Sequence, residues 1–401
     1  MALLPVEEAR ARILRDVRPL AAESIELDKA LGRVLAQPVK AKRNQPPFDS
    51  SAMDGYAVVA ADLVSAPVQL KVLGVSAAGR RYAGSMRSGE TVRIFTGAPV
   101  PKGADAVVIQ ENTLAQDPPY ISVLQGVVAG QNVRRIGLDF ARGESLIQPG
   151  TCLTSRDIGL AAAANAAHVR VRRKPVVAIL STGDELVLPG QSPRADQIVS
   201  SNSHALAAMA RRFGAEIINM GIVPDQLKAT QRAIVKAAHA DILLTTGGAS
   251  VGDHDYVQEA LVNSGVRMDF WKIAMRPGKP FMYGRRKGQH VLGLPGNPVS
   301  ALVCARLFLK PLLDAMLGLP TGDDLVEARL GTAMKQNDSR QDYVRATVSE
   351  DPDGRRVATP FNRQDSSMQR TFAQSHALIV RPPHAEAAQP GELVKILRLD
   401  F

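Results

Sequence analysis

DILLTTGGASVGDHD, at residues 241–255, is an apolar run that ends in a glycine-rich, acidic turn. Two other apolar runs also end in glycine-containing turns, VVAILSTGDEL at 176–186, which has acids, and HVLGLPGNP at 290–298, which has none. Each apolar run predicts a buried strand, and apolar residues at helical spacing in 202–213 and 227–238 predict helices between the runs. This alternation predicts a doubly wound, mainly parallel sheet with helices on both faces.

The same pattern continues around these turns. EIINMG at 216–221 predicts a further strand, and a helix is expected to begin near Asp255. Pro298 suits the first position of a last helix. Because ligands of such sheets bind beyond the carboxyl ends of the strands, all three turns are expected at one site. Glycine lets a backbone approach a ligand closely, so the TTGG and LPGNP turns could bind an anion through their amides.

Acidic side chains follow the predicted strands. They are Asp184, Glu185, Asp225, Asp253 and Asp255. Two such charges about 4 Å apart repel each other by roughly 4 kcal/mol near a protein surface. A divalent cation removes this conflict, and Mg²⁺ is typically held by one or two carboxylates together with substrate phosphate oxygens. Helix capping would explain one of these acids alone, but it explains all five less well.

Three cations occur in FWKIAMRPGKP, at residues 270–280. They are Lys272, Arg276 and Lys279. Pro277 and Gly278 predict a turn, so the cations could converge on a phosphate or oxyanion. Taken alone the segment would be an ordinary solvated loop, and its position beside two anion-binding turns favours a clamp.

The flanking regions differ in character from this central part. Residues 1–34 are expected to be mainly helical, and an irregular β-rich region follows. Its strand candidates are 68–74, 91–97, 104–110 and 121–125. Residues 158–169 predict a helix, and the short alternating runs after Asp324 predict a small β-barrel. With 401 residues and 4% aromatic content, several domains with aliphatic cores are expected.

Composition excludes several classes. Glu7 and Glu8 interrupt any N-terminal signal peptide and no apolar run is long enough to span a membrane, so a cytoplasmic protein is expected. The net charge of +10 comes from scattered basic residues without a nucleic-acid-binding signature, and the dense stretch 170–174 is interpreted as a solvated connector. Cys152 and Cys304 are interpreted as packing residues.

Common catalytic motifs are also missing from the sequence. It contains no GxSxG, no P-loop and no well-placed GxGxxG, which disfavours a serine hydrolase, a P-loop NTPase and a Rossmann dehydrogenase. His204 and His254 lack the spacing of a catalytic zinc site.

Seven motifs together resemble one family. They are SSAMDGYAV (50–58), IFTGAPVPKGADAVV (94–108), NVRRIGLDF (132–140), STGDEL, TTGGASVGDHDY, FWKIAMRPGKP and GLPGNPVSA. In this order they are similar to the molybdopterin molybdenumtransferases, the MoeA and gephyrin E-domain family. The resemblance implies a homodimer that inserts molybdenum from molybdate into adenylylated molybdopterin. It also implies cleavage of the phosphoanhydride with release of AMP, with Mg²⁺, or in some relatives Zn²⁺, as cofactor.

The resemblance also implies an organisation into four domains. They are a dimerisation domain (1–45 with 145–173), a β-rich domain (46–144), the α/β domain (174–320) and the barrel (321–401). The adenylyltransferase that makes the adenylylated pterin and the proteins that mature molybdoenzymes are implied as partners. Neither a nucleic acid nor a membrane is expected.

Site residues carry over by motif. The expected catalytic residues are Asp54, Glu185, Asp225 and Asp255, of which the last three are also the expected Mg²⁺ ligands. The expected substrate-binding and oxyanion-binding residues are Thr96, Arg134, Asp139, Gly247, Gly248, Ser250, Lys272, Arg276, Lys279, Pro295, Gly296, Asn297, Pro298 and Ser366.

Two departures from the family pattern affect this transfer. Arg276 stands where some relatives have lysine, which exchanges a compact ammonium for a planar fork. Ile136 and Leu138 stand where relatives often have arginine and glutamate. The alternative functions are a molybdopterin adenylyltransferase and a non-catalytic, gephyrin-like scaffold. The TTGGASVG turn and the large flanking domains favour the molybdenumtransferase over the adenylyltransferase.

Overall fold

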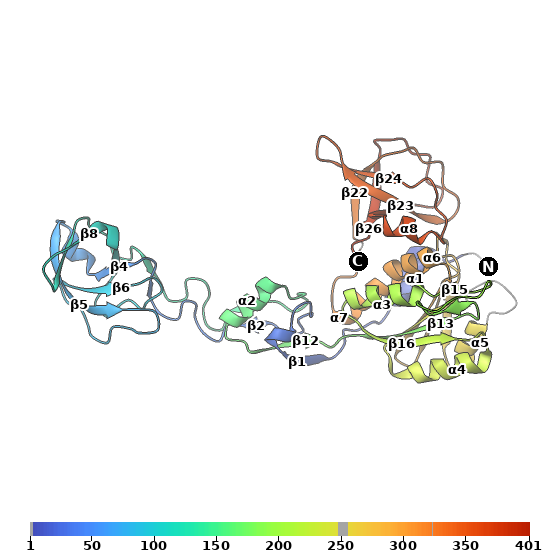
Figure 1. Ribbon diagram of the computed structural model, residues 1–401, viewed down its shortest axis with the longest axis horizontal. Helices are drawn as coiled ribbons and strands as arrows, with labels where there is room; N and C mark the ends of the chain where they lie inside the picture. Colours follow the sequence, from blue (N-terminus) through green and yellow to red (C-terminus); the bar gives the residue numbers. More distant parts are fainter. Residues whose placement is uncertain (1–2, 248–255, 323) are drawn as a thin grey trace. The chain divides into compact units, whose positions relative to one another are not determined.

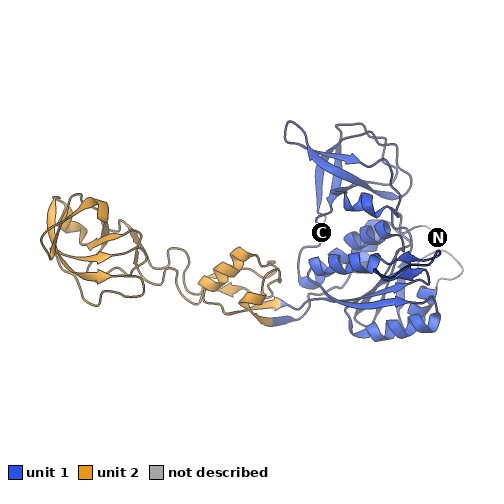
Figure 2. Ribbon diagram, in the orientation of Figure 1, with its two compact units in different colours: residues 1–23, 172–401 blue, residues 24–171 orange. Residues whose placement is uncertain are grey.

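The computed structural model describes residues 3–247, 256–322 and 324–401 (Figure 1). The chain divides into two compact units, one made of residues 1–23 and 172–401 and the other of residues 24–171 (Figure 2). The larger unit contains the α/β part and the C-terminal β part.

The α/β part is built on a six-stranded sheet. Its strands in spatial order are β16 (Glu216–Val223), β13 (Val176–Thr182), β17 (Ile242–Thr246), β21 (Gln289–Leu294), β20 (Met282–Arg286) and β18 (Arg267–Trp271). The first four are mutually parallel, and β20 is antiparallel to both of its neighbours. The predicted mainly parallel sheet is confirmed.

Helices cover both faces of this sheet. One face carries α1 (Val6–Leu14), α3 (Asn202–Arg212), α6 (Pro298–Cys304), the π-helical segment η5 (Ala305–Leu309) and α7 (Lys310–Leu317), and the other carries α4 (Leu227–Lys236) and α5 (Tyr256–Asn263). Alternate residues of β13 explain why, since Val177 and Ile179 enter one core whereas Ala178 and Leu180 enter the other. In the described part of the chain, no helix combines the length and apolar character needed to cross a membrane.

The strand order determines at which edge of the sheet a ligand can bind. The chain leaves β13 for β16 on one side and then returns to β17 on the other side of β13. The connections at the carboxyl ends of β13 and β17 therefore run in opposite directions and leave a crevice between them. Thr182 and Thr246 end the two strands at this point.

The C-terminal part is a closed barrel. Its strands are β22 (Leu325–Leu330), β23 (Gln341–Glu350), β24 (Arg356–Pro360), β25 (Ala377–Arg381) and β26 (Leu393–Arg398), with the short helix α8 (Gln369–Ala373). β23 pairs with both β24 and β25, which closes the ring, so the predicted barrel is confirmed. The two-residue strand β19 (Met275–Arg276) pairs in parallel with β23 and joins the α/β part to the barrel.

The smaller unit is rich in short strands. Its main sheet has the order β7 (Ala106–Ile109), β4 (Gly55–Val58), β6 (Glu90–Ile94), β5 (Val68–Ser76), β9 (Tyr120–Val123) and β8 (Thr113–Ala115). All four strand candidates formed, whereas β4 and β8 escaped prediction. A second core surrounds α2 (Ser155–Ala163), with β2 (Val39–Lys40) paired to β11 (Ser145–Ile147).

Four expectations were wrong in part. The opening is not helical to residue 34, because α1 ends at Leu14 and β1 (Ala22–Glu26) pairs with β12 (His168–Arg172). The helix predicted to residue 169 ends at Ala163, where Asn165 adopts a left-handed conformation that stops a helix. The expected connector at 170–174 begins within β12. Cys304 is buried as predicted, but Cys152 is exposed.

His290 lies in β21 and predicts a pH dependence of stability. Arg285 Nε donates to the Tyr283 hydroxyl oxygen at 2.6 Å, and the same oxygen is hydrogen-bonded to His290 Nδ1 at 2.8 Å. Burial, reinforced by the charge of Arg285, lowers the pKa of His290 to about 4. Below pH ~6.5 His290 binds a proton in the unfolded chain but stays neutral in the folded chain. The free energy of unfolding should therefore fall by about 3 kcal/mol in total between pH 6.5 and 4.

Denaturant titrations between pH 4 and 7.5 measure this fall. His290→Gln keeps an acceptor for Tyr283 but does not titrate, so its stability should lack this component. Equal slopes for the two proteins would show that His290 is not the group responsible.

Candidate functional site

A cavity of about 720 Å³ lies between the α/β part and the barrel within the larger unit. Residues that follow β13 and β21, together with Gly247 at the end of β17, form one wall, and residues 364–366 of the barrel form part of the other. The expected site residues that line it are Glu185, Gly247, Arg276, Lys279, Pro295, Gly296, Asn297, Pro298 and Ser366. The structure thus brings together residues from across the sheet and the barrel.

Three polar side chains in this cavity have unpaired atoms. Ser181 Oγ, Thr182 Oγ1 and Asn202 Oδ1 are buried without a hydrogen-bond partner among the described residues. Asn202 Nδ2, in contrast, is held by Thr246 Oγ1 at 2.9 Å and by the Gly296 carbonyl at 2.8 Å. An unpaired buried polar group costs about 1–3 kcal/mol, which a ligand that hydrogen-bonds to it would recover.

Sequence reasoning missed these three residues. The sequence pattern places Ser181 and Thr182 only in the turn motif that follows a strand, and Asn202 only at the start of a helix. The available signal was their polarity at the carboxyl edge of a sheet, where ligands bind.

Gly247 closes the floor of the cavity after β17. Its φ of +92° belongs to the left-handed region, and a Cβ added there would lie 2.1 Å from the Thr182 carbonyl oxygen. Only glycine therefore allows the turn after β17 to approach β13 this closely.

Gly247→Ala is expected to destabilise the protein by about 3 kcal/mol, because backbone strain and the clash with Thr182 add. Gly288→Ala is the matched control, since no atom lies within 4 Å of its added Cβ and it has no positive φ. Thermal unfolding of both variants measures the difference. Equal stability of the two variants would contradict the prediction.

The turn after β21 connects the sheet to the barrel. Pro298 stands at the first turn of α6, where its missing N–H is not needed. Asn297 Nδ2 donates to Ser366 Oγ at 2.9 Å, and the Val299 amide donates to the Ser366 carbonyl at 3.1 Å. Ser366 is therefore fixed to the LPGNP turn by two hydrogen bonds.

Three acids gather beside the cavity. Asp184 and Glu185 follow β13, Asp225 follows β16, and the Asp225 amide donates to Asp184 Oδ1 at 3.2 Å. Burial raises the pKa of Asp225, and the charges of Asp184 and Glu185 add to the effect. Within the described residues no three His, Cys, Asp or Glu side chains form a metal-binding group. The three carboxylates repel one another. A hard cation, which prefers oxygen ligands, would relieve this repulsion.

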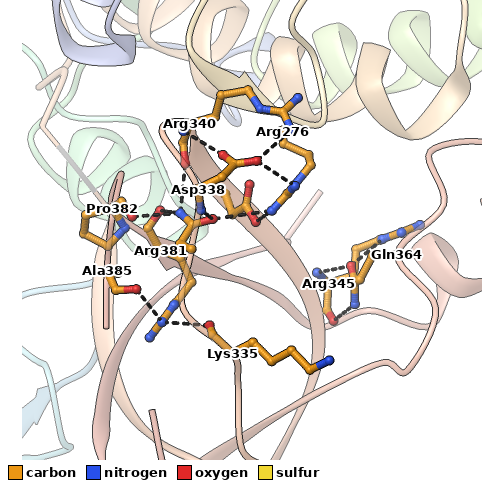
Figure 3. Close-up of polar contacts among 11 residues, drawn as sticks. Arg276, Lys335, Asp338, Arg340, Arg345, Gln364, Arg381, Pro382 and Ala385 are labelled. Carbon is orange, nitrogen blue, oxygen red and sulfur yellow. Dashed lines mark hydrogen bonds and ion pairs between the residues drawn. The ribbon is translucent and has the colours of Figure 1, made fainter. Parts of the chain in front are cut away.

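The expected cationic clamp is only partly assembled. Lys279 and Arg276 line the cavity, whereas the Lys272 ammonium lies 5.4 Å from the centre of the Trp271 ring. Arg276 is also paired with the barrel residues Asp338, at 3.1 Å, and Asp342 (Figure 3). Arg276 therefore lines the cavity and at the same time pairs with two barrel acids, with 48% of its side chain exposed.

Arg340 is a cation that the sequence reasoning missed. It lines the cavity from the barrel side, and its guanidinium donates to Asp338 Oδ2 at 2.9 Å. It was missed because the barrel carried no motif that marked it, and its place in the cavity depends on the fold.

Asp54 and Thr96 meet in the smaller unit. The Thr96 amide and hydroxyl donate to Asp54 Oδ1 at 2.7 and 2.8 Å, and these bonds lower the pKa of Asp54. Gly55 allows this turn, because a Cβ there would lie 1.8 Å from the Val108 carbonyl oxygen. Asp54 is exposed and ionised, and its second carboxylate oxygen remains available to a ligand.

The NVRR segment lies beside this pair. Arg134, in the two-residue strand β10 (Val133–Arg134), pairs with Ser50 of β3 (Ser50–Ser51), the strand that leads to Asp54. Arg134 and Asp139 are both exposed. Ile136 and Leu138, which differ from the family pattern, are 52% and 66% exposed, so they add apolar surface here.

Gly248, Ser250, Asp253, His254 and Asp255 lie outside the described residues.

Family comparisons agree with this architecture. Residues 4–165 match the MoeA N-terminal region (domain I and II), residues 178–315 a probable molybdopterin binding domain, and residues 327–399 the MoeA C-terminal region (domain IV). Proteins named molybdopterin molybdenumtransferase are similar along their length. The relative from Haemophilus influenzae is 33% identical over 98% of each chain, and that from a Nostoc species is 36% identical over 94% of this chain and 88% of its own.

Solved structures show the same fold. A crystal structure of the molybdopterin biosynthesis MoeA protein from Pyrococcus horikoshii OT3 superimposes with a TM-score of 0.83 at 30% identity, covering 99% of this chain and 100% of that one. The three family matches together span most of the chain in the family's order. The chain therefore belongs to the molybdopterin molybdenumtransferases, the MoeA family of transferases in molybdenum cofactor biosynthesis.

Proposed function

We propose that this chain inserts molybdenum from molybdate into adenylylated molybdopterin, with Mg²⁺-dependent cleavage of the phosphoanhydride and release of AMP. The cavity carries the proposal, because its volume of about 720 Å³ lies within the range of sites that bury a molecule of this size. In the reaction two dithiolene sulfurs replace an oxo ligand of molybdate, which leaves as water with both thiol protons. Water cleaves the P–O–P bond to give AMP and the pterin phosphate.

The polar groups of the cavity suit such a substrate. The unpaired hydroxyls of Ser181 and Thr182 can donate to phosphate oxygens, and the Gly247 turn lets the substrate approach the backbone. Lys279 and Arg340 supply positive charge for molybdate or phosphate oxygens. Ser366 contributes a hydroxyl from the barrel.

A magnesium ion suits the acids beside the cavity. Glu185 and Asp225 would hold it, with Asp255 as a further candidate ligand, because repulsion among the carboxylates falls when a cation binds. When bound, Mg²⁺ stabilises negative charge that develops on the phosphoanhydride oxygens. With few protein ligands, the remaining positions would be filled by phosphate oxygens and water.

Asp54 and Thr96 are proposed to complete the site. Asp54 is exposed, ionised and fixed by Thr96, so it can accept a proton or orient a water molecule. The resemblance implies a homodimer, and we propose that in it Asp54 and Thr96 of one copy act with the cavity of the other.

The deciding experiment supplies purified protein with adenylylated molybdopterin, Mg²⁺ and molybdate. AMP release that requires molybdate, together with formation of molybdenum-loaded cofactor, is the expected result. Formation of adenylylated molybdopterin from ATP and free molybdopterin, without molybdate-dependent AMP release, would instead indicate an adenylyltransferase. Binding of the substrate without any turnover would favour a scaffold.

A further inference from the structure

Arg276 belongs to β19, yet its guanidinium is engaged with the barrel (Figure 3). Nη1 donates to Asp338 Oδ2 at 3.1 Å, whereas Nη2 donates to Asp342 Oδ2 and lies 3.4 Å from Asn337 Oδ1. Arg276 also lies opposite Asp342 in the parallel pairing of β19 with β23. Both terminal nitrogens of Arg276 are therefore occupied by barrel residues.

Asp338 connects Arg276 to a second guanidinium. Arg340 Nη2 donates to Asp338 Oδ2 at 2.9 Å, and the Arg340 amide donates to Asp338 Oδ1 at 2.8 Å. These bonds lower the pKa of Asp338 to about 2, so the carboxylate stays charged at any working pH. One carboxylate oxygen, Asp338 Oδ2, thus lies between the two arginines.

Arg340 differs from Arg276 in what remains available. Both arginines line the cavity, but Arg340 uses one guanidinium nitrogen for Asp338 whereas Arg276 uses two for barrel residues, so Arg340 keeps more N–H groups for a ligand. Among the described residues, Arg276 is paired with two carboxylates, Asp338 and Asp342, whereas Arg340 is paired with Asp338. The two arginines therefore differ in role: Arg276 fixes Asp338, and Asp338 in turn fixes Arg340.

We infer that Arg276 is a positioning residue, which fixes Arg340 in the cavity wall through Asp338 instead of binding the oxyanion itself. The inference rests on the proposed function: Arg340 contacts the oxyanion, and Arg276 holds Arg340 in position. It also gives a reason for arginine at this position, because a planar fork reaches two carboxylates at once whereas a lysine ammonium is a single point charge.

A double-mutant cycle tests this relay. The proteins are the wild type, Arg276→Gln, Asp338→Asn and the double variant, and the measurements are kcat and the KM for molybdate in AMP release. Each single change is expected to raise the KM for molybdate about tenfold with kcat nearly unchanged. The KM of the double variant should not exceed the higher of the two single-variant values. Arg276→Lys should recover only part of the loss.

Controls separate the relay from folding and from the proposed function. Arg12→Gln removes an exposed ion pair with Asp269 on the same unit and should leave all constants unchanged. Equilibrium dialysis of molybdate against the four proteins repeats the cycle without turnover. If the wild type binds molybdate but releases no AMP, the proposed function fails while the relay is still tested.

Several results would overturn the inference. If Arg276→Gln weakens molybdate binding while Asp338→Asn leaves it unchanged or strengthens it, Arg276 binds the oxyanion directly. Additive losses in the double variant would show independent roles. Lower thermal stability with unchanged constants would show a structural role alone, and wild-type protein that binds no molybdate in dialysis would also refute the relay.

Discussion

Asp225→Asn is expected to lower the rate of AMP release at saturating substrate by a factor on the order of 10³ and not to lower the stability of the protein. The activity should fall because asparagine removes the charge that helps to hold Mg²⁺. The stability should stay the same or rise, because burial and the neighbouring Asp184 and Glu185 disfavour the charged form of Asp225. Loss of activity without loss of stability is typical of a residue kept for function.

The sign of the pH effect follows from the raised pKa. A carboxyl group whose pKa is higher in the folded than in the unfolded state contributes stability at low pH, and this contribution is lost as pH rises through the folded-state pKa. In the absence of Mg²⁺, the wild type should therefore lose stability relative to Asp225→Asn as pH rises above about 4. Added Mg²⁺ should reverse the difference for the wild type only.

Thermal unfolding with and without Mg²⁺, together with AMP release, measures both effects. Asp353→Asn is the matched control, since this acid is 67% exposed in the turn between β23 and β24 and its carboxylate pairs with Arg355. If Asp225→Asn retains most of the activity, or if Mg²⁺ stabilises both proteins equally, then Asp225 is not a metal ligand.

The central sheet was predictable because its signals are local. β13 is a run of apolar residues followed at once by glycine and acids. Because both of its faces are buried, the strand can be predicted without an alternation of apolar and polar residues. Neighbouring strands repeat this construction, and the rule that ligands bind at their carboxyl ends then places the site. The edges of the barrel and the smaller unit lack such runs.

Short strands and distant pairings could not be predicted. β3 and β10 have two residues each, so no periodicity exists to detect, and the Asp54 turn between β3 and β4 was found only through its resemblance to a family motif. The charge of Arg276 was visible in the sequence, but its partner Asp338 lies 62 residues further along the chain. A cation in a glycine–proline turn predicts a ligand contact equally well whether or not the fold supplies an acid.

Asp54→Ala is expected to abolish molybdate-dependent AMP release, with a loss on the order of 10³-fold or more. The carboxylate is exposed and its hydrogen bonds go to Thr96, so its removal should change the stability of the fold little. Asp62→Ala is a matched control, because Asp62 likewise accepts a hydroxyl and a backbone amide, from Ser88 at 2.6 Å and Gly89 at 2.9 Å. Asp62→Ala should keep its activity.

Mixing two inactive variants tests whether the proposed site is shared between copies. Asp54→Ala lacks the acid of the smaller unit, and Asp225→Asn lacks the acid of the larger unit. If each site takes Asp54 from one copy and Asp225 from the other, a mixed dimer has one intact site and one doubly altered site. Random reassortment makes half of the dimers mixed, so the mixture should regain about one quarter of wild-type activity. If each copy forms its own site, the mixture stays inactive, because neither chain holds both acids.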